Sequence, residues 1–441
     1  MKLLFLFRRK ANACASPRWQ SLFAGLFIGL LACLPCGLFA QVDPCSLAWH
    51  GILPANSPNS PGLLINQAVA YDSRRHVAVL FGGENPLTGV FSTSDTWEWD
   101  GTAWIKRTSG QPSTRTESAM AYDSDRGVCV LFGGGTNIFD YETPFNDTWE
   151  WDGSTWSLRS GNDPAATDRP PPLEYPVLAY DSARKRTVLL GADIHVGYTN
   201  LPVTQTWEWD GTHWSAHATA PPSRFEGTMA YDPVRRVTVL FGGVDYNTLE
   251  DLNDTWTWDG TTWREITTGG VPPRSEAAMA FDDRRGVMVM FGGMGNDVTS
   301  EFNDTWEWMG GFWTLDPYAD RFGLIPRRLP RMWYDTGDQK MVVFGGTYGV
   351  RNADGSYSYT ILDDLWEARP PGYWVDFNYA GLPSLPETGD YYTPYNTLAE
   401  AVNAAPAGCT LNLKAGSHAE TLTISKPLQL QAYNGLVTIG H

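Results

Sequence analysis

One phrase of about 50 residues recurs through most of this sequence. In its clearest form, between Arg115 and Trp156, it contains Ala-Tyr-Asp, an apolar run that ends in Gly-Gly, and then Asn-Asp-Thr-Trp-Glu-Trp-Asp-Gly. One aromatic residue anchors each copy, at Tyr71, Tyr122, Tyr180, Tyr231, Phe281 and Tyr334. A period of this length indicates a repeat architecture, in which neighbouring units stack to bury their apolar faces.

Each copy predicts four short strands. In the second copy the apolar runs are 119–122, 128–132, 149–151 and 156–158, and Gly, Asp and Ser bound them. Asp-Gly joins the last two runs, and it favours a hairpin because the tight turn needs positive φ. Four antiparallel strands cannot bury both of their faces alone. Stacking the copies around a ring does so, and the sequence therefore predicts an all-β propeller.

The double glycine, the aromatic anchors and the period resemble Kelch repeats of the galactose-oxidase-like propeller superfamily. Five copies carry the double glycine, at 82–83, 133–134, 242–243, 292–293 and 345–346. The third copy departs from the pattern with Gly191-Ala192. Six copies predict six blades. Ala48-Trp49 resembles an isolated fourth strand, so a seventh partial blade, or a closing blade shared by distant parts of the chain, is an alternative.

Other segments precede the propeller, which is expected over 65–377. Residues 1–40 read as a signal peptide, because basic residues precede an apolar run at 22–34. A lipoprotein signal that is modified at Cys33 and an uncleaved membrane anchor are the alternatives. Residues 41–64 form a lead-in that holds the candidate closing strand.

After the propeller, 378–394 read as a linker. Residues 395–441 resemble the start of a pectin-lyase-like parallel β-helix, with a short helix at 397–405 followed by runs of alternating apolar residues. No site is transferred from that family, because its catalytic rungs would lie beyond residue 441.

Charge and cysteine content narrow the function classes. The formal net charge is −17, and residues 1–40 contribute only basic charges to it. A chain with this negative charge is not expected to have the basic surface that binds nucleic acid or an anionic membrane. Beyond the leader, Cys45, Cys129 and Cys409 form no disulfide framework, and Cys129 is expected to be a buried apolar residue. No cofactor and no membrane span after signal removal are predicted, and a monomer is expected.

The long connections place the expected binding face. Connections between second and third strands, and between successive copies, are long and variable, whereas the others are short. Alternate connections of an up-and-down sheet emerge on opposite edges, so the long loops crowd one face of the ring. Variable loops on a rigid scaffold are where binding sites are built.

A recurring Arg-x-Glu pair precedes the first strand of several copies. It could form a polar funnel for a ligand at the channel mouth, because residues two apart on a strand point the same way. It could instead be a structural ladder in which Arg binds loop carbonyls or carboxylates, and we favour the ladder because a shared feature serves the repeat. The residues are Arg115 with Glu117, Arg224 with Glu226, Arg274 with Glu276, and Arg327 alone.

The third copy offers a different candidate site. It lacks the Arg-x-Glu pair, and its long loop contains Asp193, His195 and Tyr198. Asp193 and His195 could bind a metal or act as acid and base, although a His beside an Asp is more often an ordinary loop residue.

The sequence favours a secreted or cell-surface binding module that is not an enzyme and that recognises a polysaccharide or a protein through the long-loop face. The alternatives are an extracellular carbohydrate-active enzyme (an oxidase, epimerase or lyase) and a structural module of envelope assembly. No catalytic residue or metal ligand is assigned, because no nucleophile, phosphate-binding or zinc motif is present.

Overall fold

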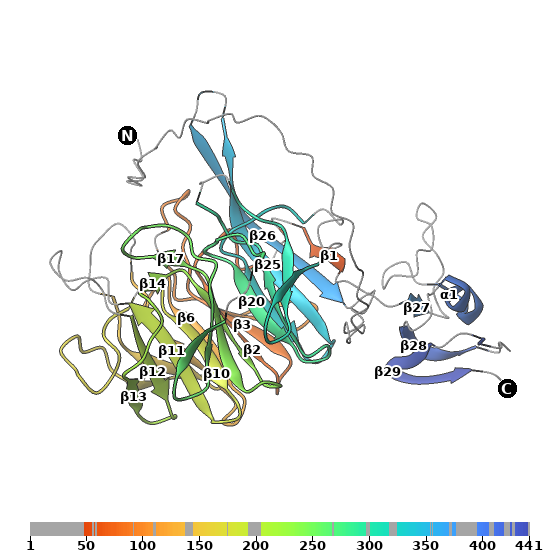
Figure 1. The fold of residues 1–441 in the computed structure, drawn as a ribbon, viewed down its shortest axis with the longest axis horizontal. Coiled ribbons are helices and arrows are strands. Elements are labelled where there is room, and N and C mark those ends of the chain that lie inside the picture. The colour runs from red at the N-terminus through yellow and green to blue at the C-terminus, as the bar shows by residue number, and fades with distance from the viewer. Residues whose placement is uncertain are drawn as a thin grey trace, which may run out of the picture. The chain divides into compact units, whose positions relative to one another are not determined.

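Six four-stranded antiparallel sheets form the blades of a propeller in the computed structural model of the chain (Figure 1). The structure describes residues 48–54, 57, 60–90, 92–108, 112–136, 144–173, 175–192, 204–266, 269–296, 300–316, 324–352, 354, 356–369, 373–375, 395–404, 410–418, 424–425 and 428–439. The first strand of every blade contacts the first strands of both neighbouring blades, so these inner strands close a ring around a central channel.

The blades follow one another in chain order. Blade 1 contains β2 (Ala68–Asp72), β3 (Val77–Phe81), β4 (Thr96–Trp99) and β5 (Trp104–Arg107). Blade 2 contains β6 (Ala119–Asp123), β7 (Val128–Phe132), β8 (Thr148–Trp151) and β9 (Trp156–Ser160). Blade 3 contains β10 (Val177–Asp181), β11 (Arg186–Ala192), β12 (Thr204–Trp209) and β13 (Trp214–His217). Blade 4 contains β15 (Thr228–Asp232), β16 (Val237–Phe241), β18 (Thr255–Trp258) and β19 (Trp263–Ile266). Blade 5 contains β20 (Ala278–Asp282), β21 (Val287–Phe291), β22 (Thr305–Trp308) and β23 (Trp313–Leu315). The short strands β14 (Arg224–Phe225) and β17 (Val244–Asp245) pair beside blade 4.

Blade 6 is completed by a strand from before blade 1. Its sheet has the order β1-β26-β25-β24, with β1 (Ala48–Leu53), β24 (Arg331–Asp335), β25 (Lys340–Arg351) and β26 (Tyr357–Arg369). Trp49 is fully buried, and its indole Nε1 donates to Thr305 Oγ1 of blade 5 at 3.1 Å. The shared closing blade is therefore the alternative that the structure adopts, with six blades in all.

The same tryptophan contact joins blade to blade at five of the six boundaries; at the sixth, the indole Nε1 of Trp104 in blade 1 is buried without a hydrogen-bond partner among the described residues. The Trp of the fourth strand donates its indole Nε1 to a Thr in the third strand of the preceding blade. These contacts are Trp156 to Thr96, Trp214 to Thr148, Trp263 to Thr206 and Trp313 to Thr255, at 2.8–2.9 Å. Trp49 makes the equivalent bond, which identifies β1 as a genuine fourth strand.

The double glycine is required by close contact between blades as well as by its φ. Gly133 and Gly134 have φ of 71° and 83°, a region that disfavours residues with a side chain. A Cβ on Gly133 would lie 2.8 Å from the carbonyl oxygen of Leu173, which precedes the inner strand of blade 3, and a Cβ on Gly134 would lie 2.3 Å from the carbonyl oxygen of Thr116 in its own blade. In the third blade Gly191-Ala192 lacks this turn, and β11 instead continues in register with β12 up to Ala192.

Blade 6 also carries the longest hairpin of the propeller. β24 pairs with β25 only up to Phe344, and β1 pairs with β26 only from Leu365 onward. Between these limits, Gly346–Arg351 pairs with Tyr357–Leu362 as a two-stranded extension, and at its base Thr347 also pairs with Arg328 (Figure 1). The extension continues from the end of β25 that leads into the long connection, so it belongs to the long-loop face.

The C-terminal part forms a separate three-stranded parallel sheet. It contains β27 (Tyr373–Val375), β28 (Thr410–His418) and β29 (Gln429–Ile439), together with helix α1 (Leu398–Ala404). β27 belongs to this sheet, although residues 373–375 fall inside the range expected for the propeller. The parallel pairing fits the opening of a β-helix, and that family assignment remains a prediction. No helix in the described part of the chain is both long and apolar enough to cross a membrane.

Candidate functional site

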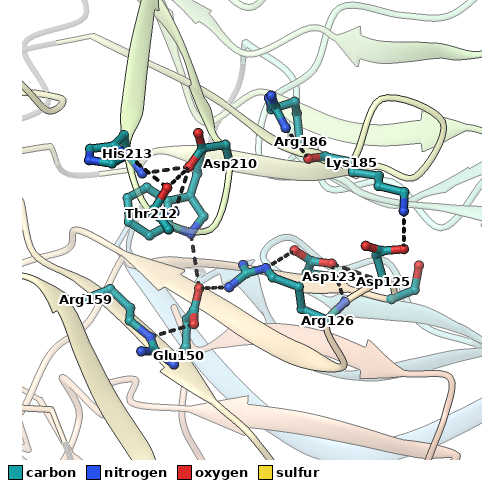
Figure 2. A network of polar contacts seen from close by, with 12 residues as sticks. Asp123, Asp125, Arg126, Glu150, Arg159, Lys185, Arg186, Asp210, Thr212 and His213 are labelled. Carbon is teal, nitrogen blue, oxygen red and sulfur yellow. Dashed lines mark hydrogen bonds and ion pairs between the residues drawn. The ribbon is translucent and has the colours of Figure 1, made fainter.

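The charged groups at the short-turn end of the propeller are engaged with one another. Glu150 of blade 2 is 1% exposed, and it accepts hydrogen bonds from Arg126 and Arg159. Trp209 of blade 3 donates its indole Nε1 to the same carboxylate at 3.1 Å, so the network joins two blades (Figure 2). His213 lies in the adjacent turn, where its backbone N–H donates to Asp210. This end is therefore built for stability, and the opposite end is the candidate binding face.

The long connections meet at that opposite end. β6 pairs with β7 so that Ala119 lies opposite Phe132, and the residues just before β6 therefore lie beside the connection that leaves β7. The same register recurs in all six blades, with each inner strand beginning opposite the end of the second strand. The channel thus opens among the long loops.

Six residues, one per blade, surround this opening, and we call them the mouth ring. Each has a left-handed backbone with φ between 50° and 59°, which is uncommon for residues other than glycine. Backbone hydrogen bonds of 2.9–3.1 Å join several neighbours across the blade boundaries. The ring consists of Asn66, Glu117, Tyr175, Glu226, Glu276 and Leu329. Because all six share the backbone conformation but not the side chain, the conformation serves the repeat and the side chains are free to differ.

The four arginines of the Arg-x-Glu motif point away from the mouth. Arg274 is 1% exposed, and its guanidinium binds both carboxylate oxygens of Asp304 at 2.6 and 2.9 Å and the carbonyl of Gly292 at 2.9 Å. Its Cζ also lies 4.0 Å from the ring centre of Phe302. Equivalent bidentate pairs are Arg115 with Asp147, Arg224 with Asp254 and Arg327 with Asp364.

These contacts show that the Arg and the Glu of the Arg-x-Glu motif lie in different environments. The expectation that Arg and Glu share one face assumes an extended strand, and it is wrong because the Glu residue is left-handed. The turn sends Arg into the blade and places Glu117, Glu226 and Glu276 around the mouth. The arginines make the contacts of a structural ladder, and only the glutamates remain candidates for ligand binding.

The two blades without the arginine support this reading. Blades 1 and 3 have Leu64 and Leu173 at the arginine position, and both are buried. Blade 3 also replaces the aspartate with Gln205, which accepts the indole Nε1 of Trp207 at 3.0 Å. An apolar side chain can thus fill the arginine position, provided that the residues around it change too.

The mouth carboxyls are close enough to influence one another. The pKa of Glu226 is raised well above its ordinary value, first by burial and then by the negative charges of Glu276 and Glu117. Burial also raises the pKa of Glu276, although the positive charge of Arg328 opposes that shift. Some area of both side chains stays exposed because they line the opening. A carboxyl with a raised pKa can donate a hydrogen bond as well as accept one.

Arg328 connects the mouth to the long hairpin. Its Nη1 lies 3.4 Å from Glu276 Oε2, and its Cζ lies 5.3 Å from the ring centre of Tyr359 in β26. The backbone N–H of Gly349 in β25 donates to Glu301 Oε1 at 3.0 Å. The backbones of Arg328 and Thr347 in β25 also exchange two hydrogen bonds of 2.9 Å, so several contacts hold the base of the hairpin beside the mouth.

Two cavities share lining residues, including Pro176 and Arg331, at this end of the propeller. The small one, of about 90 Å³, is enclosed by the mouth ring, and the larger central channel, of about 490 Å³, runs between the inner strands. Tyr175 lines the small cavity, and burial together with the charges of Glu117 and Glu226 raises the pKa of its hydroxyl well above the usual value. The mouth offers hydrogen-bond donors and acceptors around a narrow opening, which suits a ligand rich in hydroxyl groups.

Several residues of this site were not singled out from the sequence. Tyr175, Arg328 and Arg331 line or border the mouth, yet none belongs to the shared motif. Aligning the copies on their glycine pairs would have exposed Tyr175 and Arg331, because each stands where most other copies carry a different type of residue.

Two predicted features fall outside this description. Asp193, His195 and Tyr198 lie outside the described residues. Within the described ranges, no group of three or more His, Cys, Asp or Glu side chains has a geometry that could hold a metal ion. Cys129 is buried in the core between blades 1 and 2, as expected of a small apolar residue.

Comparison with known proteins supports the fold alone. No protein-family model and no curated protein matches the sequence. A similar solved structure is that of YjhT, a Kelch-type propeller, with a TM-score of 0.50 and 13% sequence identity. The match covers 70% of this chain and 95% of that one. At this identity the likeness shows a shared propeller and carries no information on ligand or activity.

Proposed function

We propose that this chain is a secreted or cell-surface binding module that recognises a polysaccharide through the long-loop face of its propeller. The mouth ring carries the proposal, because its backbone conformation is shared by six blades whereas its side chains differ, and all of them except Leu329 can form hydrogen bonds. The basic and apolar leader at 1–40 supports export. A hydroxyl-rich unit would exchange hydrogen bonds with Glu226, Glu276 and Tyr175 at the opening.

A glycan array probed with the full-length chain tests this proposal. We expect saturable binding to at least one polysaccharide, and a loss of about tenfold or more in affinity in the double variant Glu226→Ala/Glu276→Ala, because two hydrogen-bonding groups are removed. Glu265→Gln, an exposed change on β19, is the control and should bind normally. Binding that survives the double variant would exclude the mouth. Binding to a protein but to no glycan would redirect the proposal to a protein ligand.

A carbohydrate-active enzyme, such as an epimerase or a lyase, is the second candidate. Burial raises the pKa values of both Glu226 and Glu276, and the charge of Glu276 raises that of Glu226 further; neighbouring carboxyls with shifted pKa values are typical of acid–base pairs. Glu226→Gln separates the two functions. A binding module should keep its affinity, because Gln resembles the protonated acid, and should never convert the bound glycan. An enzyme would convert the glycan and lose turnover in the variant while still binding.

A further inference from the structure

Arg331 breaks the repeat at the inner end of blade 6. It is the first residue of β24 and lies opposite Phe344, the last residue before the double glycine. The equivalent position in the other five blades holds a small or medium-sized residue. These residues are Ala68, Ala119, Val177, Thr228 and Ala278. The fold therefore accommodates alanine here in three of its blades, and the architecture does not require a guanidinium.

The Arg331 side chain lines both the mouth cavity and the central channel. Its Nε is buried and has no hydrogen-bond partner, and among the described residues no carboxylate lies within ion-pair distance of its guanidinium. Glu276 is the acidic group that acts on it, but that carboxylate pairs with Arg328. Burial lowers the pKa of Arg331 to about 10, and the negative charge of Glu276 opposes that shift.

The Arg331 side chain is partly exposed to the channel, but its Nε is buried without a hydrogen-bond partner, and no carboxylate in the described part of the chain pairs with its charge. The ladder arginines differ in this respect, because each binds two carboxylate oxygens and a carbonyl oxygen. Arg331 thus offers an unsatisfied donor and an unpaired charge to a ligand that enters the channel. The guanidinium fork matches the planar geometry of a carboxylate, and it also binds sulfate strongly.

We propose that Arg331 binds the anionic substituent of an acidic saccharide whose sugar unit enters through the mouth ring. This inference rests on the proposed function and specifies its ligand class. The hydroxyl groups of the unit meet Glu226 and Tyr175, while its carboxylate or sulfate reaches Arg331 at the junction with the channel. The channel volume of about 490 Å³ lies in the range of small-molecule sites.

The test compares acidic polysaccharides with chemically neutralised forms of the same chains. Alginate, polygalacturonate, hyaluronate and chondroitin sulfate are arrayed beside their carboxyl-reduced or desulfated counterparts and probed with the full-length chain. We expect at least one acidic glycan to bind ten times or more tighter than its neutral counterpart. Arg331→Ala should abolish that preference and leave neutral binding unchanged, and Arg331→Lys should restore part of it.

Folding is controlled separately. Arg331→Ala introduces the residue that three other blades carry, so its melting temperature should equal or exceed that of the wild-type protein. Arg264→Ala removes an exposed arginine on β19 and should leave the preference intact. Equal binding of acidic and neutral forms, or a preference that survives Arg331→Ala, overturns the anion site but leaves the binding module standing. Binding to no glycan at all overturns both proposals.

Discussion

At the level of single residues, a left-handed residue before each inner strand decides which neighbouring side chains stabilise the blade and which ones face the mouth. It directs the preceding arginine into the blade and the glutamate to the mouth. An Arg-to-Ala change should therefore affect stability, whereas a change in the mouth ring should affect the ligand.

Arg274→Ala should lower the free energy of unfolding by about 3–5 kcal/mol, because it leaves the Asp304 carboxylate without its bidentate partner. Urea denaturation measures the effect. The exposed Arg264→Ala should change stability by no more than about 0.5 kcal/mol.

Blade 3 suggests how that loss can be repaired. The double variant Arg274→Leu/Asp304→Gln copies Leu173 and Gln205, and it should recover more than half of the stability lost in Arg274→Ala. Gln can still accept the indole N–H that Trp306 now donates to Asp304 at 2.7 Å. A double variant less stable than Arg274→Ala would contradict the ladder interpretation.

Glu84 should make stability depend on pH. It is 1% exposed, it accepts a hydrogen bond from Asn66 of the mouth ring, and burial raises its pKa from 4.5 to about 7. The folded state therefore binds the proton more tightly than the unfolded state. The stabilisation is fully present below pH 4.5 and is lost as the pH rises through about 7.

Glu84→Gln removes this titration. The difference in unfolding free energy, variant minus wild type, should increase by roughly 3 kcal/mol between pH 4.5 and pH 8. Denaturation at a series of pH values measures it, with the exposed Glu265→Gln as the flat control. A difference that does not change with pH would show that Glu84 has an ordinary pKa.

The site could be predicted from the sequence only in part. The motif brought Glu117, Glu226 and Glu276 to attention, because they recur. Their direction could not be predicted, since period-two reasoning assumes an extended backbone and these residues are left-handed. Arg331 was missed for the opposite reason: it occurs once, in a strand position where an apolar pattern predicts burial.

At the level of secondary-structure elements, the turn after each second strand holds neighbouring blades together. Gly133→Ala should lower the unfolding free energy by about 2–4 kcal/mol, because the new Cβ would lie 2.8 Å from the Leu173 carbonyl oxygen at the start of blade 3 and the backbone has φ of 71°. Gly161→Ala is the matched control, since nothing lies within 4 Å of its added Cβ. Equal stability of the two variants would mean that the blades do not approach so closely.

Strand order and register could be predicted from the repeat because turn chemistry and apolar runs agree in every copy. The third blade shows the limit of that agreement. Without its second glycine β11 continues to Ala192, whereas the second strands of blades 1, 2, 4 and 5 end at the Phe before the double glycine. The length of the β25–β26 hairpin also lay beyond prediction, because two-stranded extensions carry no core pattern.

At the level of the whole molecule, closure by β1 decides whether the ring is a single cooperative unit. Trp49→Ala and Trp313→Ala remove equivalent indoles from blades 6 and 5, and each should cost about 3–5 kcal/mol. Guanidinium denaturation with tryptophan fluorescence compares them. A much smaller loss in Trp49→Ala would show that the ring is held closed without its first strand.

The closing strand also sets the order in which the molecule can be completed. Trp49 lies opposite Ala368, so a strand that leaves the ribosome before blade 1 must wait until blade 6 has been synthesised. Contacts between residues so distant in sequence form slowly. Until then the free edges of β1 and β26 can pair with other chains. The last blade therefore forms only in a chain that contains both β1 and β24–β26, and a polypeptide interrupted anywhere inside the propeller cannot close the ring.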